Sequence, residues 1–263
     1  MLQRKLWIYS IIFCLVMAIT FPKSAICQND SISIHHTGYI HSYFYNGIGL
    51  LKSPLKWNGE DWSKATAAIL VTGLTLTMDD AISEPIFKWQ SRDAKNFGKA
   101  GKFLGNLVPQ LSISALSIGY GAITKNQKVK NFGLDNLQSQ VYIGGLTYFI
   151  KEITHRARPF TGLDKYSFSG PFKNGGYESF YSGHSALAFG TATMLYLHSK
   201  KNIWVGVAGY SIATGIAVSR LQKQEHWASD VILGAIMGSA ISTFVYKQQE
   251  KRRFLKQSLK PLP

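Results

Sequence analysis

Apolar segments with helical spacing recur along the chain from residue 63 onward. They lie near residues 63–80, 103–124, 136–152, 184–199, 203–218 and 229–247. Each is longer than a typical strand and rich in alanine, leucine, isoleucine and glycine, which indicates helix rather than strand. Polar links that contain glycine separate them. The pattern predicts an all-α domain over residues 63–247, a helical bundle of about six core helices.

The regions that flank this domain have weaker periodicity. Residues 28–62 are polar and aromatic, and we expect an irregular N-terminal arm there, with room for a short helix. Residues 248–263 carry many lysines and arginines and predict a basic C-terminal tail that frays. One folded domain between two extensions is therefore expected.

The apolar segments are poor candidates for membrane spans. Most are interrupted by a polar or charged residue before about 18 apolar positions accumulate, whereas a span needs about 20. The mean hydropathy of −0.01 is low for a protein with six spans. We expect a water-soluble or membrane-surface bundle. An embedded body is the alternative, because segments 203–218 and 229–247 are quite apolar.

The first residues have the pattern of an export signal. A basic start precedes an apolar stretch, and small residues at Ala25 and Cys27 suit cleavage before Gln28. We expect residues 1–27 to be a signal peptide; an uncleaved membrane anchor and a lipoprotein attachment at Cys27 are the alternatives. Cleavage would remove both cysteines of the chain, so the mature protein would have no disulfide and no cysteine nucleophile.

The composition indicates an anionic ligand. The chain carries 29 lysines and arginines against 14 acidic residues, a formal charge of +15. Such a balance favours contact with phosphates, acidic lipids or nucleic acid. Basic and aromatic residues do not interleave as they do in nucleic-acid-binding proteins. We therefore expect phosphate or lipid, and no nucleic acid, as the partner.

A first polar cluster is the stretch KEITHRARPF. Lys151 and Arg158 are seven residues apart, two helical turns, so they can share a face. Pro159 disfavours helix at Arg158 and is expected to end the segment there. Two cations at one helix end predict a phosphate clamp, and a basic helix end favoured by the macrodipole is the alternative. His155 and Arg156, which lie between them, are expected to be solvated.

A second cluster, SFYSGHSALAFG, begins a strongly helical run. Ser182 has the position of an N-cap, and Gly183 lets an anion approach the N–H groups of the first turn. His184, on that turn, can donate a proton to a leaving group. The alternative is an ordinary cap beside a surface histidine.

A third cluster, SRLQKQEHWASD, lies between the last two apolar segments. His226 and Asp230 are spaced i, i+4, so the carboxylate can reach the imidazole if the link is helical. An aspartate that holds one ring N–H leaves the other nitrogen free as a nucleophile. Arg220 adds a third cation. The alternative is a solvated charged turn.

All three clusters lie where a predicted helix begins or ends, as expected of a site between bundle helices. Their chemistry is complementary, because they combine three cations, a helix N-terminus, an oriented nucleophile and a second histidine. We therefore expect an active site at helix ends on one side of the bundle.

The same three stretches carry a family resemblance. KEITHRARP resembles the K-x6-RP motif of the type 2 phosphatidic acid phosphatase and vanadium haloperoxidase superfamily. YSGH is similar to its PSGH motif, and SRLQKQEHWASD matches its SR-x5-H-x3-D motif completely. The resemblance covers about residues 63–247. Tyr181 stands where the family usually has proline, which affects the loop geometry and removes no reacting group.

The resemblance implies a role for each matching residue. His226 would attack phosphorus and form a phosphohistidine, and Asp230 would orient it. His184 would protonate the leaving oxygen and then activate water. The phosphate would be held by Lys151, Arg158, Ser182, Gly183 and Arg220. No metal and no cofactor are expected, since three cations can stabilise the charge of phosphoryl transfer.

The expected function is a metal-independent phosphatase for a phosphomonoester or pyrophosphate, acting outside the cytoplasm as a periplasmic or membrane-associated protein. A membrane lipid phosphate is the favoured substrate and a soluble phosphomonoester the alternative. Two competing functions are a vanadate-dependent haloperoxidase, in which His226 would bind vanadate, and an inactive binding or scaffold protein.

The remaining polar residues receive structural interpretations. Asp79 and Asp80 are expected at a helix end. His198 has no partner that the sequence identifies. The six tryptophans are expected in the core or at an interface, and Trp227, beside His226, is also a candidate for the pocket wall.

Overall fold

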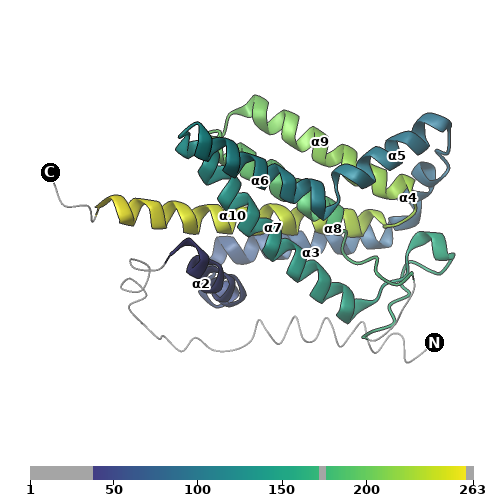
Figure 1. Ribbon diagram of the computed structural model, residues 1–263. Coiled ribbons are helices and arrows are strands. Elements are labelled where there is room, and N and C mark those ends of the chain that lie inside the picture. The colour runs from purple at the N-terminus through teal and green to yellow at the C-terminus, as the bar shows by residue number, and fades with distance from the viewer. Residues whose placement is uncertain (1–37, 172–175, 259–263) are drawn as a thin grey trace. The chain divides into compact units, whose positions relative to one another are not determined.

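The computed structural model describes residues 38–171 and 176–258. Within them lie nine α-helices, two short 3-10 helices and no strand beyond one isolated bridge, between Arg156 and Phe168. The α-helices are α2 (Tyr39–Lys52), α3 (Gly59–Thr77), α4 (Asp79–Phe87), α5 (Arg92–Leu104), α6 (Leu107–Ile123), α7 (Gln127–Thr154), α8 (Gly183–His198), α9 (Ile203–Gln222) and α10 (Ala228–Ser258) (Figure 1). The 3-10 helices are Ser53–Lys56 and Pro159–Thr161. The prediction of an all-α fold is confirmed.

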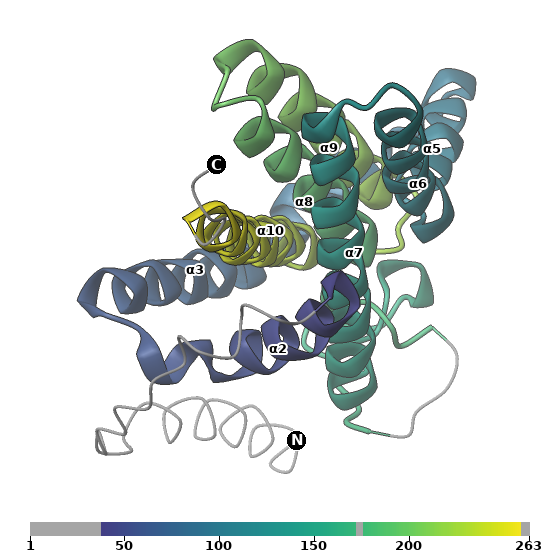
Figure 2. The same ribbon diagram turned by 60° about the vertical axis from the view of Figure 1, so that its left-hand side comes forward.

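Helix α8 is the inner helix of the bundle. It contacts α6, α7, α9 and α10, while α5 packs on α9 and α3 packs on α10 (Figure 2). The main apolar core lies where α7, α8 and α10 meet. Its buried side chains include Ile143 of α7, Met194 of α8, and Ile241 and Val245 of α10. The ends of these helices therefore have fixed positions relative to one another.

Glycines let α8 and α10 approach closely. A Cβ at Gly238 would lie 2.0 Å from the Ala186 carbonyl oxygen, and one at Gly234 would lie 2.5 Å from the Ser182 carbonyl oxygen. No side chain fits at these two positions without a shift of the helices. This contact holds the start of α8 beside the start of α10, where the second and third polar clusters lie.

Both extensions of the predicted domain are more helical than expected. The arm predicted over 28–62 contains α2 and the start of α3, and residues 248–258 continue α10 instead of fraying. A polar contact ties these parts together, because Gln249 donates to Gln138 Oε1 (2.7 Å) and to Ser42 Oγ (2.9 Å). The predicted signal peptide, residues 1–27, and the last five residues lie outside the described residues.

Large apolar side chains are exposed on several helices. They include Ile69, Leu70 and Leu74 of α3, Val108, Leu116 and Ile123 of α6, and Trp204 and Ile212 of α9. Among the described helices, α10 alone has the length and hydropathy to cross a membrane, and 50% of its most apolar window is buried in the bundle. Helices α3 and α4 meet the same criterion only as a pair bent by 62°. An apolar surface of this extent indicates contact with lipid or another protein.

Candidate active site

Lys151 and Arg158 come from the end of α7 and the segment after it. The helix ends at Thr154, where His155 adopts a left-handed conformation (φ 38°). Arg158 lies in extended chain and its N–H donates to the Gly176 carbonyl (2.9 Å). The expectation that the two cations share a helical face is therefore wrong, because the helix stops four residues before Arg158. An extended segment after the helix, not a helical face, carries the arginine.

Ser182 caps α8 as predicted. Its hydroxyl accepts from the Ser185 N–H (3.4 Å), and its own N–H donates to the Asp230 carbonyl (3.0 Å). Gly183 is the first residue of the helix, and His184 lies in its first turn. The His184 Nε2 atom is buried. The alternative of a surface histidine is therefore wrong.

The third cluster is buried and is no solvated turn. Arg220, His226 and Asp230 are at most 1% exposed. Arg220 lies in the last turn of α9, and Asp230 in the first turn of α10. All three clusters thus lie at helix ends, and neighbouring ends meet through the packing of α7, α8, α9 and α10.

A backbone carbonyl holds the His226 imidazole. Its Nδ1 lies 2.7 Å from the Ser179 carbonyl oxygen and 3.9 Å from Asp230 Oδ2. The expected direct bond to Asp230 is absent, because the link is not helical at His226 and α10 begins only at Ala228. A carbonyl only accepts, so Nδ1 carries the proton and Nε2 keeps a free lone pair.

Two glutamates, missed by the sequence analysis, face the arginines of the site. Glu225 Oε2 accepts from Arg158 Nη1 (3.3 Å) and from Arg220 Nη2, and Glu178 Oε2 accepts from Arg158 Nη2 (3.5 Å). Glu225 is also 3.8 Å from Lys102 of α5. One carboxylate thus bridges the two arginines, which places both guanidinium groups on the same side of the molecule.

Several buried donors of the site have no partner among the described residues. They are Arg158 Nε, Arg220 Nε and Nη1, and His184 Nε2. A buried polar group without a partner costs about 1–3 kcal/mol. Native structures seldom retain such groups without a role. An anion that accepts from them would satisfy all of these groups together. We call Lys151, Arg158, Ser182, Gly183 and Arg220 the cradle.

Burial and neighbouring cations shift the titrating groups of the site. Burial lowers the pKa of His226 to about 4, against the raising effect of Asp230. Burial, and then Arg220, lower the pKa of His184 to about 3. Burial, and then Arg158, lower the pKa of Lys151 to about 8. At neutral pH both imidazoles are therefore neutral, and His226 Nε2 is available as a nucleophile.

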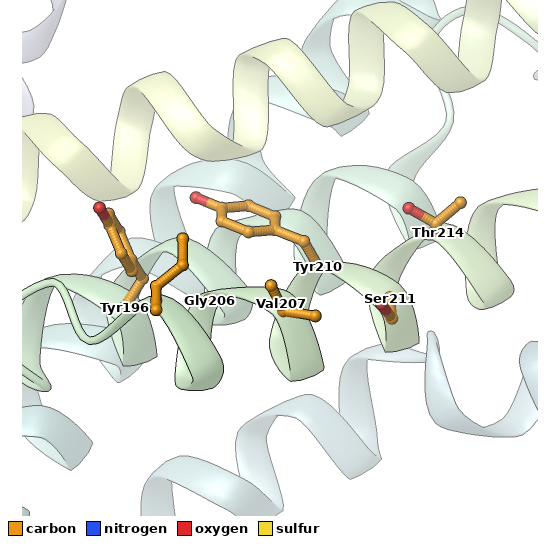
Figure 3. Close-up of a pocket in the computed structure, with 7 residues that line it drawn as sticks. Tyr196, Gly206, Val207, Tyr210, Ser211 and Thr214 are labelled. Carbon is orange, nitrogen blue, oxygen red and sulfur yellow. The ribbon is translucent and has the colours of Figure 1, made fainter.

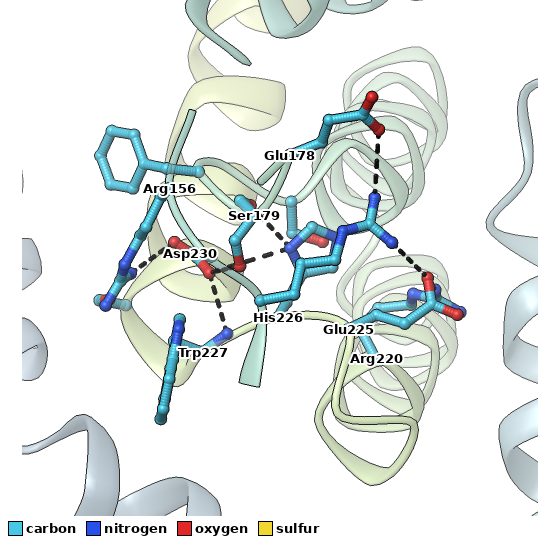
Figure 4. Close-up of polar contacts among 12 residues, drawn as sticks. Arg156, Glu178, Ser179, Arg220, Glu225, His226, Trp227 and Asp230 are labelled. Carbon is cyan, nitrogen blue, oxygen red and sulfur yellow. Dashed lines mark hydrogen bonds and ion pairs between the residues drawn. The ribbon is translucent and has the colours of Figure 1, made fainter. Parts of the chain in front are cut away.

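Behind Asp230 lies an ion-pair network that the sequence analysis missed (Figure 4). Arg156 Nη1 donates to Asp230 Oδ1 (2.6 Å) and to Ser229 Oγ (2.8 Å), and its Nη2 donates to Asp79 Oδ2 (2.7 Å). Asp79 lies at the start of α4 as expected, and it also accepts from the Ser229 N–H (2.8 Å). The expectation that Arg156 is solvated is wrong, since the residue is 0% exposed. No local signal in the sequence marks it.

The expectation that His155 is solvated is wrong, since His155 is buried. His198, for which the sequence identified no partner, has its Nε2 3.0 Å from Asp135 Oδ2 at the other end of α8. Trp227 is buried with its Nε1 donating to the Ala157 carbonyl (3.0 Å), so it packs behind the site instead of lining a pocket.

A groove of about 690 Å³ runs along α9, and its lining residues are different from those of the three clusters (Figure 3). It is lined by Tyr196, Ile203, Gly206, Val207, Tyr210, Ser211 and Thr214, none of which is charged. Thr214, the lining residue nearest Arg220 along α9, lies about 9 Å from it along the helix axis. Among the described residues, no three His, Cys, Asp or Glu side chains are grouped to hold a metal ion.

Comparison with known proteins places these residues in a family context. The family description that matches residues 137–254 is the PAP2 superfamily. The chain is 39% identical over 174 residues to the lipid A 1-phosphatase of Porphyromonas gingivalis, covering 66% of this chain and 35% of the relative. It is 34% identical over 107 residues to a probable diacylglycerol pyrophosphate phosphatase 1 of Schizosaccharomyces pombe, covering 34% and 38%. The chain thus matches little more than a third of the length of these curated relatives.

One solved structure is similar in fold. A transmembrane PAP2 type phosphatidylglycerolphosphate phosphatase from Bacillus subtilis aligns with a TM-score of 0.50 and 20% identity. The alignment covers 76% of this chain and 99% of that one. The matched family range, 137–254, includes every residue of the three clusters.

Proposed function

This chain belongs to the PAP2 superfamily, and on that premise we propose that it is a metal-independent phosphatase acting through a phosphohistidine. Its substrate would be a phosphomonoester or pyrophosphate of a membrane lipid. The observation that carries the proposal is the set of buried, unpartnered nitrogens of Arg158, Arg220 and His184 beside the neutral His226 imidazole. These donors suit the oxygens of one tetrahedral anion.

The chemistry follows from the two imidazoles. His226 Nε2 attacks phosphorus, the bond from phosphorus to the leaving oxygen breaks, and that oxygen takes a proton from His184. Water then attacks the phosphohistidine, gives a proton to His184, and releases phosphate and free His226. The low pKa of His184 in the empty site requires that the bound phosphate, an anion, raise it before the first step.

The cradle supplies charge and position. Phosphoryl transfer needs stabilisation of charge on the equatorial oxygens and little covalent help from the protein. Lys151, Arg158 and Arg220 provide three cations, and the N-terminus of α8, capped by Ser182, provides the oriented N–H group of Gly183.

Two observations support a lipid as the substrate. The curated relatives named above are a lipid A 1-phosphatase and a probable diacylglycerol pyrophosphate phosphatase. The exposed apolar side chains of α3, α6 and α9 would contact a membrane. We propose that the protein is membrane-associated and exported, with the active site outside the cytoplasm.

The test is phosphate release from a panel of phosphatidic acid, phosphatidylglycerol phosphate, undecaprenyl pyrophosphate, lipid A and p-nitrophenyl phosphate. The wild type should be active in the presence of EDTA and inhibited by vanadate, whereas His226→Ala should be inactive. His198→Ala is the matched control, since His198 lies fourteen residues along α8 from His184, about 21 Å. Activity of His226→Ala at the wild-type level, or bromide oxidation with vanadate and peroxide in place of phosphate release, would contradict the proposal.

A further inference from the structure

The buried guanidinium of Arg156 has a partner at each nitrogen. Beyond its two carboxylates, its Nε donates to the Lys165 carbonyl (2.9 Å). The rings of Phe168 and Trp227 lie 5.4 Å and 5.6 Å from the guanidinium carbon, within reach of a cation–π interaction. Arg156 therefore differs from the cradle arginines, since Arg158 Nε and both Nε and Nη1 of Arg220 have no partner among the described residues. The Arg156 guanidinium is fully occupied by contacts within the protein and pairs with none of the cradle residues.

The two oxygens of Asp230 have different partners. Oδ1 accepts from Arg156, while Oδ2 accepts from the Ser179 hydroxyl (2.5 Å) and the Trp227 N–H (2.9 Å). Oδ2 is the oxygen that faces His226 Nδ1, at 3.9 Å. Ser179 also supplies the carbonyl that accepts from His226. The Ser179 hydroxyl and the Trp227 N–H, which flank the imidazole, thus both donate to the Asp230 carboxylate. The same carboxylate accepts from Arg156.

The network holds one cation between two carboxylates. The single positive charge of Arg156 balances one of the two negative charges of Asp79 and Asp230. One negative charge of this buried pair is therefore left without a cation in the network. With Nδ1 protonated, the imidazole ring of a phosphorylated His226 would be cationic and would balance the remaining carboxylate charge, while the cradle cations would hold the anionic oxygens of its phosphoryl group. Without Arg156, two buried carboxylates would lack a cation, and one would take up a proton. A protonated Asp230 no longer stabilises a cationic imidazole.

We propose that Arg156 is a positioning residue: its buried guanidinium fixes the Asp230 carboxylate and, through it, the His226 imidazole. Asp79 holds the guanidinium from α4. The inference rests on the proposed phosphohistidine mechanism and adds a residue that lies inside the first motif but at none of its fixed positions.

The test is Arg156→Lys, which keeps the charge but replaces a planar fork by a point charge. With p-nitrophenyl phosphate, kcat should fall between about tenfold and a hundredfold, as for other partners that orient a functional histidine. KM and the inhibition constant of vanadate should stay within about twofold, because the cradle is intact. If Arg156 only stabilised the fold, Arg156→Lys would lower the melting temperature but would not lower kcat selectively at an unchanged KM.

Two results would overturn the inference. One is a kcat of Arg156→Lys within about threefold of the wild type. The other is a loss of vanadate affinity as large as the loss of kcat, since Arg156 would then act on the cradle. A wild type that releases no phosphate from any substrate of the panel would instead contradict the proposed function, so the two failures are distinguishable.

A second variant covers the case in which Arg156→Lys does not fold. Arg156→Met combined with Asp79→Asn removes one cation and one anion, so no additional buried charge is left uncompensated. It should fold by circular dichroism and lose at least as much kcat as Arg156→Lys. Arg253→Lys is the matched control and should keep the wild-type kcat, because Arg253 pairs with Asp135 (2.9 Å) about 35 Å along α10 from Asp230. Wild-type kcat in the folded double variant would also overturn the inference.

Discussion

Lys151 should set an alkaline limit to phosphate binding. Burial, and then the charge of Arg158, lower the pKa of this lysine to about 8. Its ammonium group is therefore present below about pH 8 and lost above it. At pH 7 about nine tenths of the lysine is charged, and at pH 9 only about one tenth. If the ammonium is required in the cradle, kcat/KM should fall about tenfold per pH unit above pH 8.

Lys151→Arg tests this origin of the limit. A guanidinium stays charged throughout the pH range of the assay. The alkaline fall in kcat/KM should therefore disappear from that range in Lys151→Arg, even if the rate of this variant at neutral pH is lower than that of the wild type. The limit in kcat should lie at higher pH than that in kcat/KM, because bound phosphate favours the charged lysine.

The assay is hydrolysis of p-nitrophenyl phosphate in a series of buffers at constant ionic strength. Lys64→Arg is the control, since Lys64 pairs with Glu60 at the surface of α3 and should leave the limit near pH 8. An alkaline limit that remains unchanged in Lys151→Arg would refute the reasoning, because another group would then be titrating.

Three further variants test packing and charge. Gly238→Ala places a Cβ 2.0 Å from a backbone oxygen of α8 and should cost about 1–3 kcal/mol of stability; a melting temperature equal to that of Gly144→Ala, where the space is open, would contradict this. Asp135→Asn removes the buried carboxylate that contacts His198 and Arg253. This variant should have a lower melting temperature and the wild-type kcat. Glu225→Gln removes the anion that bridges the cradle arginines, so vanadate should inhibit more tightly; weaker inhibition would show that this carboxylate orients the arginines instead.

Local chemistry in the sequence predicts much of the fold and of the site. Ser182 could be identified as a helix cap because Ser-Gly precedes a continuous apolar run, and the cap is present. The six apolar segments correspond to α3, α6, α7, α8, α9 and α10, with the second also covering the end of α5. Helix caps and apolar periodicity depend only on residues that are close together in the chain, so they can be recognised from the sequence alone.

Features that depend on distant parts of the chain were not predictable in the same way. Arg156 meets Asp79 across 77 positions and Asp230 across 74, and nothing near Arg156 in the sequence distinguishes it from a solvated arginine. The spacing of His226 and Asp230 suggested a direct bond, but the helix begins too late to form it. The polar arm became helical because α2 packs against the bundle, where Tyr142 donates to the Tyr43 carbonyl (2.5 Å).

The central claim is that a neutral His226, held by Ser179 and backed by Asp230, takes the phosphoryl group before water does. The stereochemical course of hydrolysis at an isotopically chiral phosphorothioate ester tests it most directly. Two successive in-line displacements predict retention of configuration at phosphorus. Inversion would mean a single direct attack by water, and would contradict the account.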